Sequence, residues 1–224
     1  LRSAWSTDVL KNGIAHKTMT IEKTFEQGAT DSFIRYRGCR VNTMDLTLEA
    51  RQIARVSFGI VGIGSPTPTT AILSGATYTA PNTNPVLNAA TNIGALTVSG
   101  VVGTPKIRSL SMSIRSNIYQ NDVIGQYEAD SHGLGRFEVS GSATLLFDTL
   151  AYYNAILDHS DVGLEFTLGA ATGDKYTFEL PALKLMNGSP VIGGNSQAVI
   201  MEVPFQAKYD AGIAATMQIT REVA

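Results

Sequence analysis

Apolar and polar residues alternate with a period of two along most of this chain. In the segment 41–51, every second residue from Met44 to Leu48 is apolar, and those between them are polar. Because successive side chains of a β-strand point to opposite faces, this period predicts strands with one buried face. Similar stretches are 17–25, 32–37, 56–60, 109–115, 137–147, 162–168, 176–185, 197–209 and 217–223. So many amphipathic strands predict an all-β fold, an antiparallel β-sandwich or barrel.

One segment has helical spacing instead. Between residues 148 and 159, apolar side chains recur every three or four positions, as they do along one face of a helix. They are Leu150, Tyr153, Ile156 and Leu157. Asp148 stands just before them, and its carboxylate can accept hydrogen bonds from the free amides of a first helical turn. We expect one short helix at about 148–158, flanking the sheet and capped by Asp148.

Two parts of the chain are similar in chemical type. Residues 40–49 match residues 106–115 position by position, and each stretch leads to a later strand that contains Val-Ser. A duplication explains this match, and so does chance, because any two amphipathic strands look alike. We expect two similar hairpins, about 38–62 and 104–147, within a single domain that spans residues 1–224.

Two long connections interrupt the strands. The segment 65–95 is rich in Thr, Ala, Asn, Pro and Gly and has few residues that could form a core. It is too long for an ordinary connection between strands. We expect a projecting loop or hairpin that becomes ordered when a partner covers it. The second connection, 117–135, carries Asp122, Glu128, Asp130 and His132.

Charge and cysteine content exclude some classes of protein. The chain has 17 Lys and Arg against 19 Asp and Glu, a net charge of -2, so no overall field attracts nucleic acid or anionic membranes. The single cysteine, Cys39, excludes an internal disulfide and a zinc site with several cysteines. We find no run of about 18 apolar residues and no leader, and therefore expect neither a membrane span nor a signal peptide.

Catalytic and cofactor motifs do not stand out. The glycines of 59–64 and 100–106 lack the order of a phosphate-binding loop. The three histidines are far apart and lack metal-ligand spacing. The polar run 158–161 follows the expected helix, where such residues ordinarily satisfy backbone groups, and the acidic loop 122–132 lacks the spacing of a calcium loop. We expect no catalytic residues, no metal and no cofactor. A hydrolase would need a cleft that gathers Asp, His and Ser with shifted acidities.

Five stretches occur in an order and spacing that resemble one known family. They are 18–25 (T-M-T-I-E-K-T-F), 36–44 (Y-R-G-C-R-V-N-T-M), 56–62, 140–147 and 178–185, with a tyrosine-containing helix before the last. The first two resemble the T-I-E-K and F-x-G-C-x-V-N-x-L strands of tail tube proteins from phages with long, non-contractile tails. The resemblance covers about residues 14–224. Members usually carry a longer region before the first strand, so this chain is either a short member or lacks that part.

The resemblance implies a structural role in the virion. It implies a tail-tube type of sandwich or barrel with a flanking helix and long projecting loops. It implies assembly in the host cytoplasm into stacked hexameric rings, whose lumen holds the tape measure protein and conducts double-stranded DNA. Tail terminator and tail-tip proteins would be further partners. No catalytic residues come with this resemblance.

The polar faces of the two matched strands are our candidates for the lumen wall. The residues are Thr43, Asp45, Thr47, Glu49, Ser109, Ser111, Ser113 and Arg115. Clustered cations would retain DNA by binding its phosphates, so a passage for DNA should be hydroxyl-lined or acidic. Arg115 is the exception in this set.

Other functions agree with the same strands. Another virion component, such as a tail terminator or a capsid decoration protein, would share the β-rich composition but form a single closed ring or trimer. A small-ligand binding β-barrel would need apolar side chains lining an interior cavity.

Overall fold

The computed structural model describes residues 8–14, 17–81, 83, 86–90, 92–94, 96–169 and 174–223. Its strands are β1 (Val9–Lys11), β2 (Met19–Phe25), β3 (Ser32–Glu49), β4 (Arg55–Val61), β5 (Thr67–Thr69), β6 (Thr97–Ser99), β7 (Ile107–Arg115), β8 (Tyr119–Asn121), β9 (Ser131–Gly133), β10 (Glu138–Leu146), β11 (Asp161–Leu168), β12 (Asp174–Leu185), β13 (Pro190–Val191), β14 (Ile200–Ala207) and β15 (Gln218–Val223). The helix is α1 (Ala151–Leu157). The expected all-β class is confirmed.

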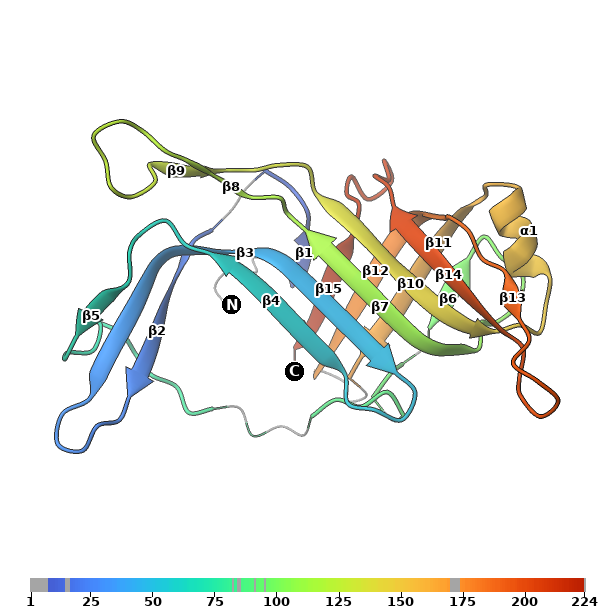
Figure 1. Cartoon of the computed structure of the whole chain (residues 1–224), viewed down its shortest axis with the longest axis horizontal. Helices are drawn as coiled ribbons and strands as arrows, with labels where there is room; N and C mark the ends of the chain where they lie inside the picture. The colour runs from blue at the N-terminus through green and yellow to red at the C-terminus, as the bar shows by residue number, and fades with distance from the viewer. Residues whose placement is uncertain are drawn as a thin grey trace.

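Thirteen strands of the described chain form one antiparallel sheet that folds over into two packed layers (Figure 1). The first layer is β4, the second half of β3, β7, β10 and β14, and the second contains β12, β11, β15, β6 and β1. The layers join where residues 183–185 of β12 pair with residues 205–207 of β14. The sheet does not close into a barrel. Of the two predicted architectures, the structure therefore agrees with the sandwich, and it does not support a small-ligand binding β-barrel.

The core lies between the two layers and follows the alternation of the sequence. Leu46, Leu110 and Met112 from the first layer are almost completely buried, as the period of two predicts. From the second layer, the ring of Phe166 stacks on that of Phe178 with centroids 5.0 Å apart. Buried residues of both layers and of α1 form one continuous cluster, and burial of these apolar side chains is the main stabilising contribution.

The helix is present, but its expected cap is wrong. The helix begins at Ala151, and Leu150 at the N-cap position makes no side-chain cap bond, whereas Thr149 Oγ1 accepts from the amide of Ala151 at 3.2 Å. Asp148 instead forms an ion pair with Lys106 at 2.8 Å, which directs its carboxylate away from the first turn. Tyr152, Ala155 and Ile156 are buried, so α1 closes one end of the sandwich.

Strand β3 is longer than its sequence pattern indicates, because it continues through Gly38. This glycine has a φ of +60°, which favours residues without a side chain. The pairing of β3 with β2 is irregular at the same place, between Met19 and Ile21. The first half of β3 therefore leaves the sandwich and pairs with β2 and β5. We call these three paired segments, β2, residues 32–39 and β5, the arm (Figure 1).

The segment 65–95, expected to project, is attached to the molecule at both ends. Strand β5 pairs with residues 33–35 of the arm. At the other end, the amide of Ala54 donates to the carbonyl of Leu87, and that of Gly94 donates to Thr167. Leu87 packs against the core, which explains why this end is held. We call residues 70–81, which follow β5, the strap.

The connection 117–135 forms a hairpin of β8 and β9 that projects from the first layer (Figure 1). Glu128, in the loop between β8 and β9, accepts hydrogen bonds from Arg37 at 3.2 Å and from the amide of Ser65 at 2.9 Å. His132 is buried within β9.

Candidate functional site

The outer face of the first layer is a continuous polar surface built from five neighbouring strands. In these strands every second residue is apolar and points into the core, so the residues between them point away from the core. We call this surface the polar wall. It consists of Arg55, Ser57, Gly59, Thr43, Asp45, Thr47, Glu49, Ser109, Ser111, Ser113, Arg115, Glu138, Ser140, Ser142, Thr144, Glu202, Pro204 and Gln206.

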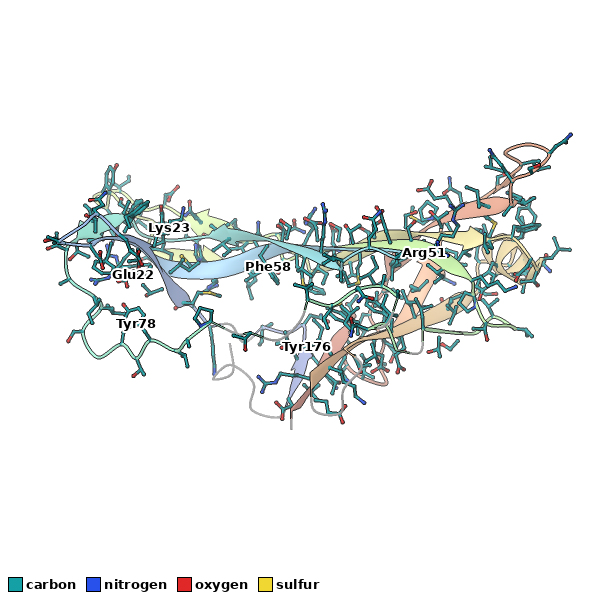
Figure 2. The ribbon with its side chains drawn as sticks, turned by 90° about the horizontal axis from the view of Figure 1, so that it is seen from below. Glu22, Lys23, Arg51, Phe58, Tyr78 and Tyr176 are labelled. Carbon is teal, nitrogen blue, oxygen red and sulfur yellow. The ribbon has the colours of Figure 1, made fainter. Side chains whose placement is uncertain are left out.

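All eight residues predicted from the sequence lie on this wall, and the register brings them together in pairs. Strands β3 and β7 are antiparallel neighbours, with Asp45 opposite Ser113 and Thr47 opposite Ser111. Thr43 stands opposite Arg115, and Glu49 opposite Ser109. The second layer lies on the other side of this sheet (Figure 2).

One group on the wall is joined by hydrogen bonds to Asp45. Ser113 Oγ donates to its Oδ1 at 2.7 Å, and Arg115 Nη1 donates to its Oδ2 at 3.1 Å. The hydrogen bond from Arg115 and then that from Ser113 lower the pKa of the Asp45 carboxyl below its usual value. Asp45 is therefore charged at neutral pH and offsets the only cation on β7's polar face.

Neighbouring strands extend the same chemistry. Ser142 Oγ on β10 donates to Glu202 Oε1 on β14 at 3.0 Å. The wall as a whole carries two arginines, Arg55 and Arg115, against four carboxylates. These are Asp45, Glu49, Glu138 and Glu202. The surface is thus hydroxyl-rich and weakly acidic.

Sequence reasoning missed the contributions of β4, β10 and β14 to this wall. Their alternation was visible, for example Ser140, Ser142 and Thr144 between apolar residues of β10. However, only the register, with Ser142 opposite both Ser111 and Pro204, shows which faces adjoin.

The other polar clusters of the sequence have structural roles. Asp161 forms ion pairs with Lys184 at 2.7 Å and with Lys208 at 2.5 Å, and the lysines lower its pKa. The carbonyl of His159 accepts from Lys184. These contacts tie the end of α1 to the two layers. The acidic loop 122–132 forms the β8–β9 hairpin described above.

Among the residues with described positions, no group of three or more His, Cys, Asp or Glu side chains could hold a metal ion. The described part of the chain contains no helix with the length and hydropathy needed to cross a bilayer.

Comparison with known families decides the identity. The family model described as phage tail tube protein matches residues 2–207 of the 224. The chain belongs to the phage tail tube protein family. No curated protein matches it. This tail tube protein is therefore a structural component of the phage virion.

Proposed function

We propose that this tail tube protein, acting as one unit over residues 1–224, polymerises as stacked hexameric rings with the polar wall facing the lumen. The lumen holds the tape measure protein until double-stranded DNA passes through it into the host. Assembly takes place in the host cytoplasm, and tail terminator and tail-tip proteins bind the two ends of the tube. The observation that carries this proposal is the unbroken polar wall across β4, β3, β7, β10 and β14.

The chemistry of the wall supports passage of DNA. A surface that neutralises many phosphates binds DNA by releasing its counterions, so an inner surface with many cations would hold the genome in place. The wall has more carboxylates than arginines. One of the two arginines, Arg115, is already paired with Asp45 at 2.9 Å. DNA would meet hydroxyl groups and a weak repulsion, and neither retains it.

A charge substitution on the wall tests this role. We expect phage particles that carry Thr47→Lys together with Ser113→Lys to form tails of normal length but to eject DNA more slowly. The added cations would bind phosphates during passage, and the delay should shrink as salt is raised. Ejection is followed by the fluorescence of a DNA-binding dye after receptor addition.

The matched control is Thr47→Gln with Ser113→Gln, which adds similar length without charge. Equal ejection rates for the two variants would contradict a lumen position of the wall. Electron microscopy of the purified protein tests the polymer itself. Growth into filaments supports a tube, whereas a single closed ring that never stacks would favour a tail terminator or decoration protein.

A further inference from the structure

Strand β4 exposes a row of large apolar side chains on the side that faces the core. Val56 stands opposite Leu46, and Phe58 opposite Met44, so the row lies on the core side of the first layer. Yet Val56, Phe58 and Ile60 are 42%, 53% and 44% exposed. The alternation that buries β7 and β10 thus continues onto β4, where the rest of the described chain leaves it uncovered (Figure 2).

The same strand is also an open sheet edge. Its one neighbour among the described strands is β3, so the backbone groups along its outer side lack a strand partner there. Natural proteins protect such edges with Lys, Pro, bulges or covering segments, because an open edge pairs readily with another chain. Over its seven residues β4 has neither Lys nor Pro, and its pairing with β3 is irregular only between Val41 and Thr43. An apolar row along an open edge is typical of a surface that another protein covers.

A second apolar surface lies on the opposite side of the molecule, at α1 (Figure 1). Leu150, the N-cap residue, and Leu157, the last residue of α1, are seven positions apart and therefore lie on the same side of the helix. They are 61% and 60% exposed. We call Leu150 and Leu157 the helix patch.

We propose that the β4 row of one copy of this chain docks against the helix patch of a second copy. This inference rests on the proposed function, which supplies the partner, since a tube is built from copies of the same chain. The two surfaces differ and lie at opposite edges of the first layer, one on β4 and the other beyond β14 at α1. Their contact is therefore head-to-tail, leaves one surface of each kind free, and repeats until a ring closes.

The alternative pairing makes a different assembly. If β4 paired with β4 of another copy, the two edges would cover each other about a two-fold axis and growth would end at a dimer. The head-to-tail contact instead sets the polar wall of each copy beside that of the next. We call this contact between the β4 row and the helix patch the seam. It explains how the wall continues from subunit to subunit.

Two single substitutions test the seam. Phe58→Lys blocks the β4 row, and Leu157→Lys blocks the helix patch. Both side chains are more than half exposed, so the fold should tolerate the change. We expect each variant alone to be monomeric by light scattering under conditions where the wild type assembles. Mixed in equal amounts, they should form a heterodimer, because each contributes its intact surface. The two introduced charges have the same sign, so charge attraction cannot create this pairing.

The outcomes separate the seam from the proposed function. A wild type that stays monomeric at high concentration overturns both. A wild type that assembles while Phe58→Lys assembles equally well overturns the seam alone. If Leu157→Lys forms homodimers and Phe58→Lys does not, the contact is two-fold and the head-to-tail inference is wrong. Two monomeric variants that fail to pair also overturn it. Ile124→Lys, on the exposed tip of the β8–β9 hairpin, is the control and should keep wild-type side-by-side association.

Discussion

At the scale of single residues, one glycine determines how closely β10 approaches its neighbours. Gly141 lies on the core side of β10, opposite Met112 and Phe205. A Cβ at this position would lie 2.2 Å from the carbonyl oxygen of Ser111 and 2.4 Å from the ring of Phe205. The backbone and a buried ring would both have to move, because neither atom lies at the end of a flexible side chain.

We therefore predict that Gly141→Ala destabilises the protein by about 1–3 kcal/mol, the usual cost of overpacking a core. Urea unfolding followed by circular dichroism measures the change. Gly13→Ala is the matched control, since a Cβ there meets no atom within 4 Å. Equal stability of the two variants would show that the core around Phe205 is looser than this packing implies.

Asp45 shows how one carboxylate sets the character of the wall. It pairs with Arg115 across two strands, although both side chains are partly exposed. Exposed ion pairs contribute at most about 1 kcal/mol to stability, so the pair is of small value for folding. Its larger effect is on the surface potential, because it offsets the positive charge of Arg115 on the polar wall.

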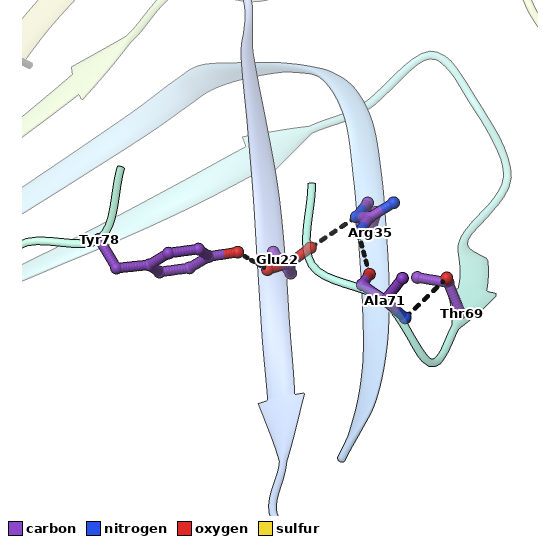
Figure 3. Close-up of polar contacts among 5 residues, drawn as sticks. All are labelled: Glu22, Arg35, Thr69, Ala71 and Tyr78. Atoms are coloured by element: carbon purple, nitrogen blue, oxygen red, sulfur yellow. Dashed lines mark hydrogen bonds and ion pairs between the residues drawn. The ribbon is translucent and has the colours of Figure 1, made fainter. Parts of the chain in front are cut away.

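At the scale of elements, the strap is held to the arm by a small polar network (Figure 3). The hydroxyl of Tyr78 donates to Glu22 Oε1 at 2.5 Å, and Arg35 Nε donates to Glu22 Oε2 at 2.5 Å. Arg35 also donates to the carbonyl of Ala71. The hydrogen bond from Tyr78, followed by that from Arg35, lowers the pKa of Glu22, and the bond to Glu22 raises the pKa of Tyr78.

The pKa shifts predict the pH range in which the strap stays attached. The pKa of Glu22 is lowered in the folded protein, so its charged form stabilises the attachment fully above its unfolded pKa of about 4.3. This stabilisation is lost as the pH falls through the lower pKa of the folded state. The pKa of Tyr78 is raised, so its neutral hydroxyl stabilises the attachment fully below its unfolded pKa of about 10. This stabilisation is lost as the pH rises through the higher pKa of the folded state. Hydrogen exchange of the strap, corrected for intrinsic rates, should therefore speed up toward acid and toward alkali.

Removing the Tyr78 hydroxyl tests the same network at neutral pH. In Tyr78→Phe we expect proteinase K to cleave the strap several-fold faster, because local opening exposes its backbone. The melting temperature of the sandwich should not change. Tyr127→Phe, an exposed tyrosine on the β8–β9 hairpin, is the control. Unchanged cleavage in Tyr78→Phe would mean that other contacts hold the strap.

The long strands could be predicted from the sequence because their period of two reflects one buried face. β11 and β12 follow the predicted stretches to within two residues. Strands of two or three residues, such as β5, β6 and β13, are too short to show a period. The stretches 32–37 and 41–51, which the sequence predicts separately, are joined in β3 through Gly38, which has a positive φ. The period gave β4 an apolar face but could not indicate that the second layer stops short of it.

The eight wall residues could be predicted for a similar reason, since alternation alone separates the two faces of β3 and β7. Their arrangement could not, because register across five strands depends on contacts distant in sequence. The helix cap failed because Lys106, 42 positions away, binds Asp148 in place of the helix amides. Whether the two hairpins arose by duplication stays a prediction.

At the scale of the whole molecule, the chain is a sandwich body with an arm and a hairpin (Figure 1). Exposed apolar side chains lie on β4 and at α1. The body supplies the polar wall, and in the proposed tube the β4 row and the helix patch make the contacts between neighbouring copies. As a member of the tail tube family, the protein assembles into a tube from copies of itself.

An electron cryomicroscopy reconstruction of assembled tubes tests the central claim most directly. We predict stacked six-fold rings in which Thr47, Ser111 and Ser142 line the inner surface, with β4 of each subunit beside α1 of the next. A tube with these three side chains on its outer surface, or buried between subunits, would contradict the account.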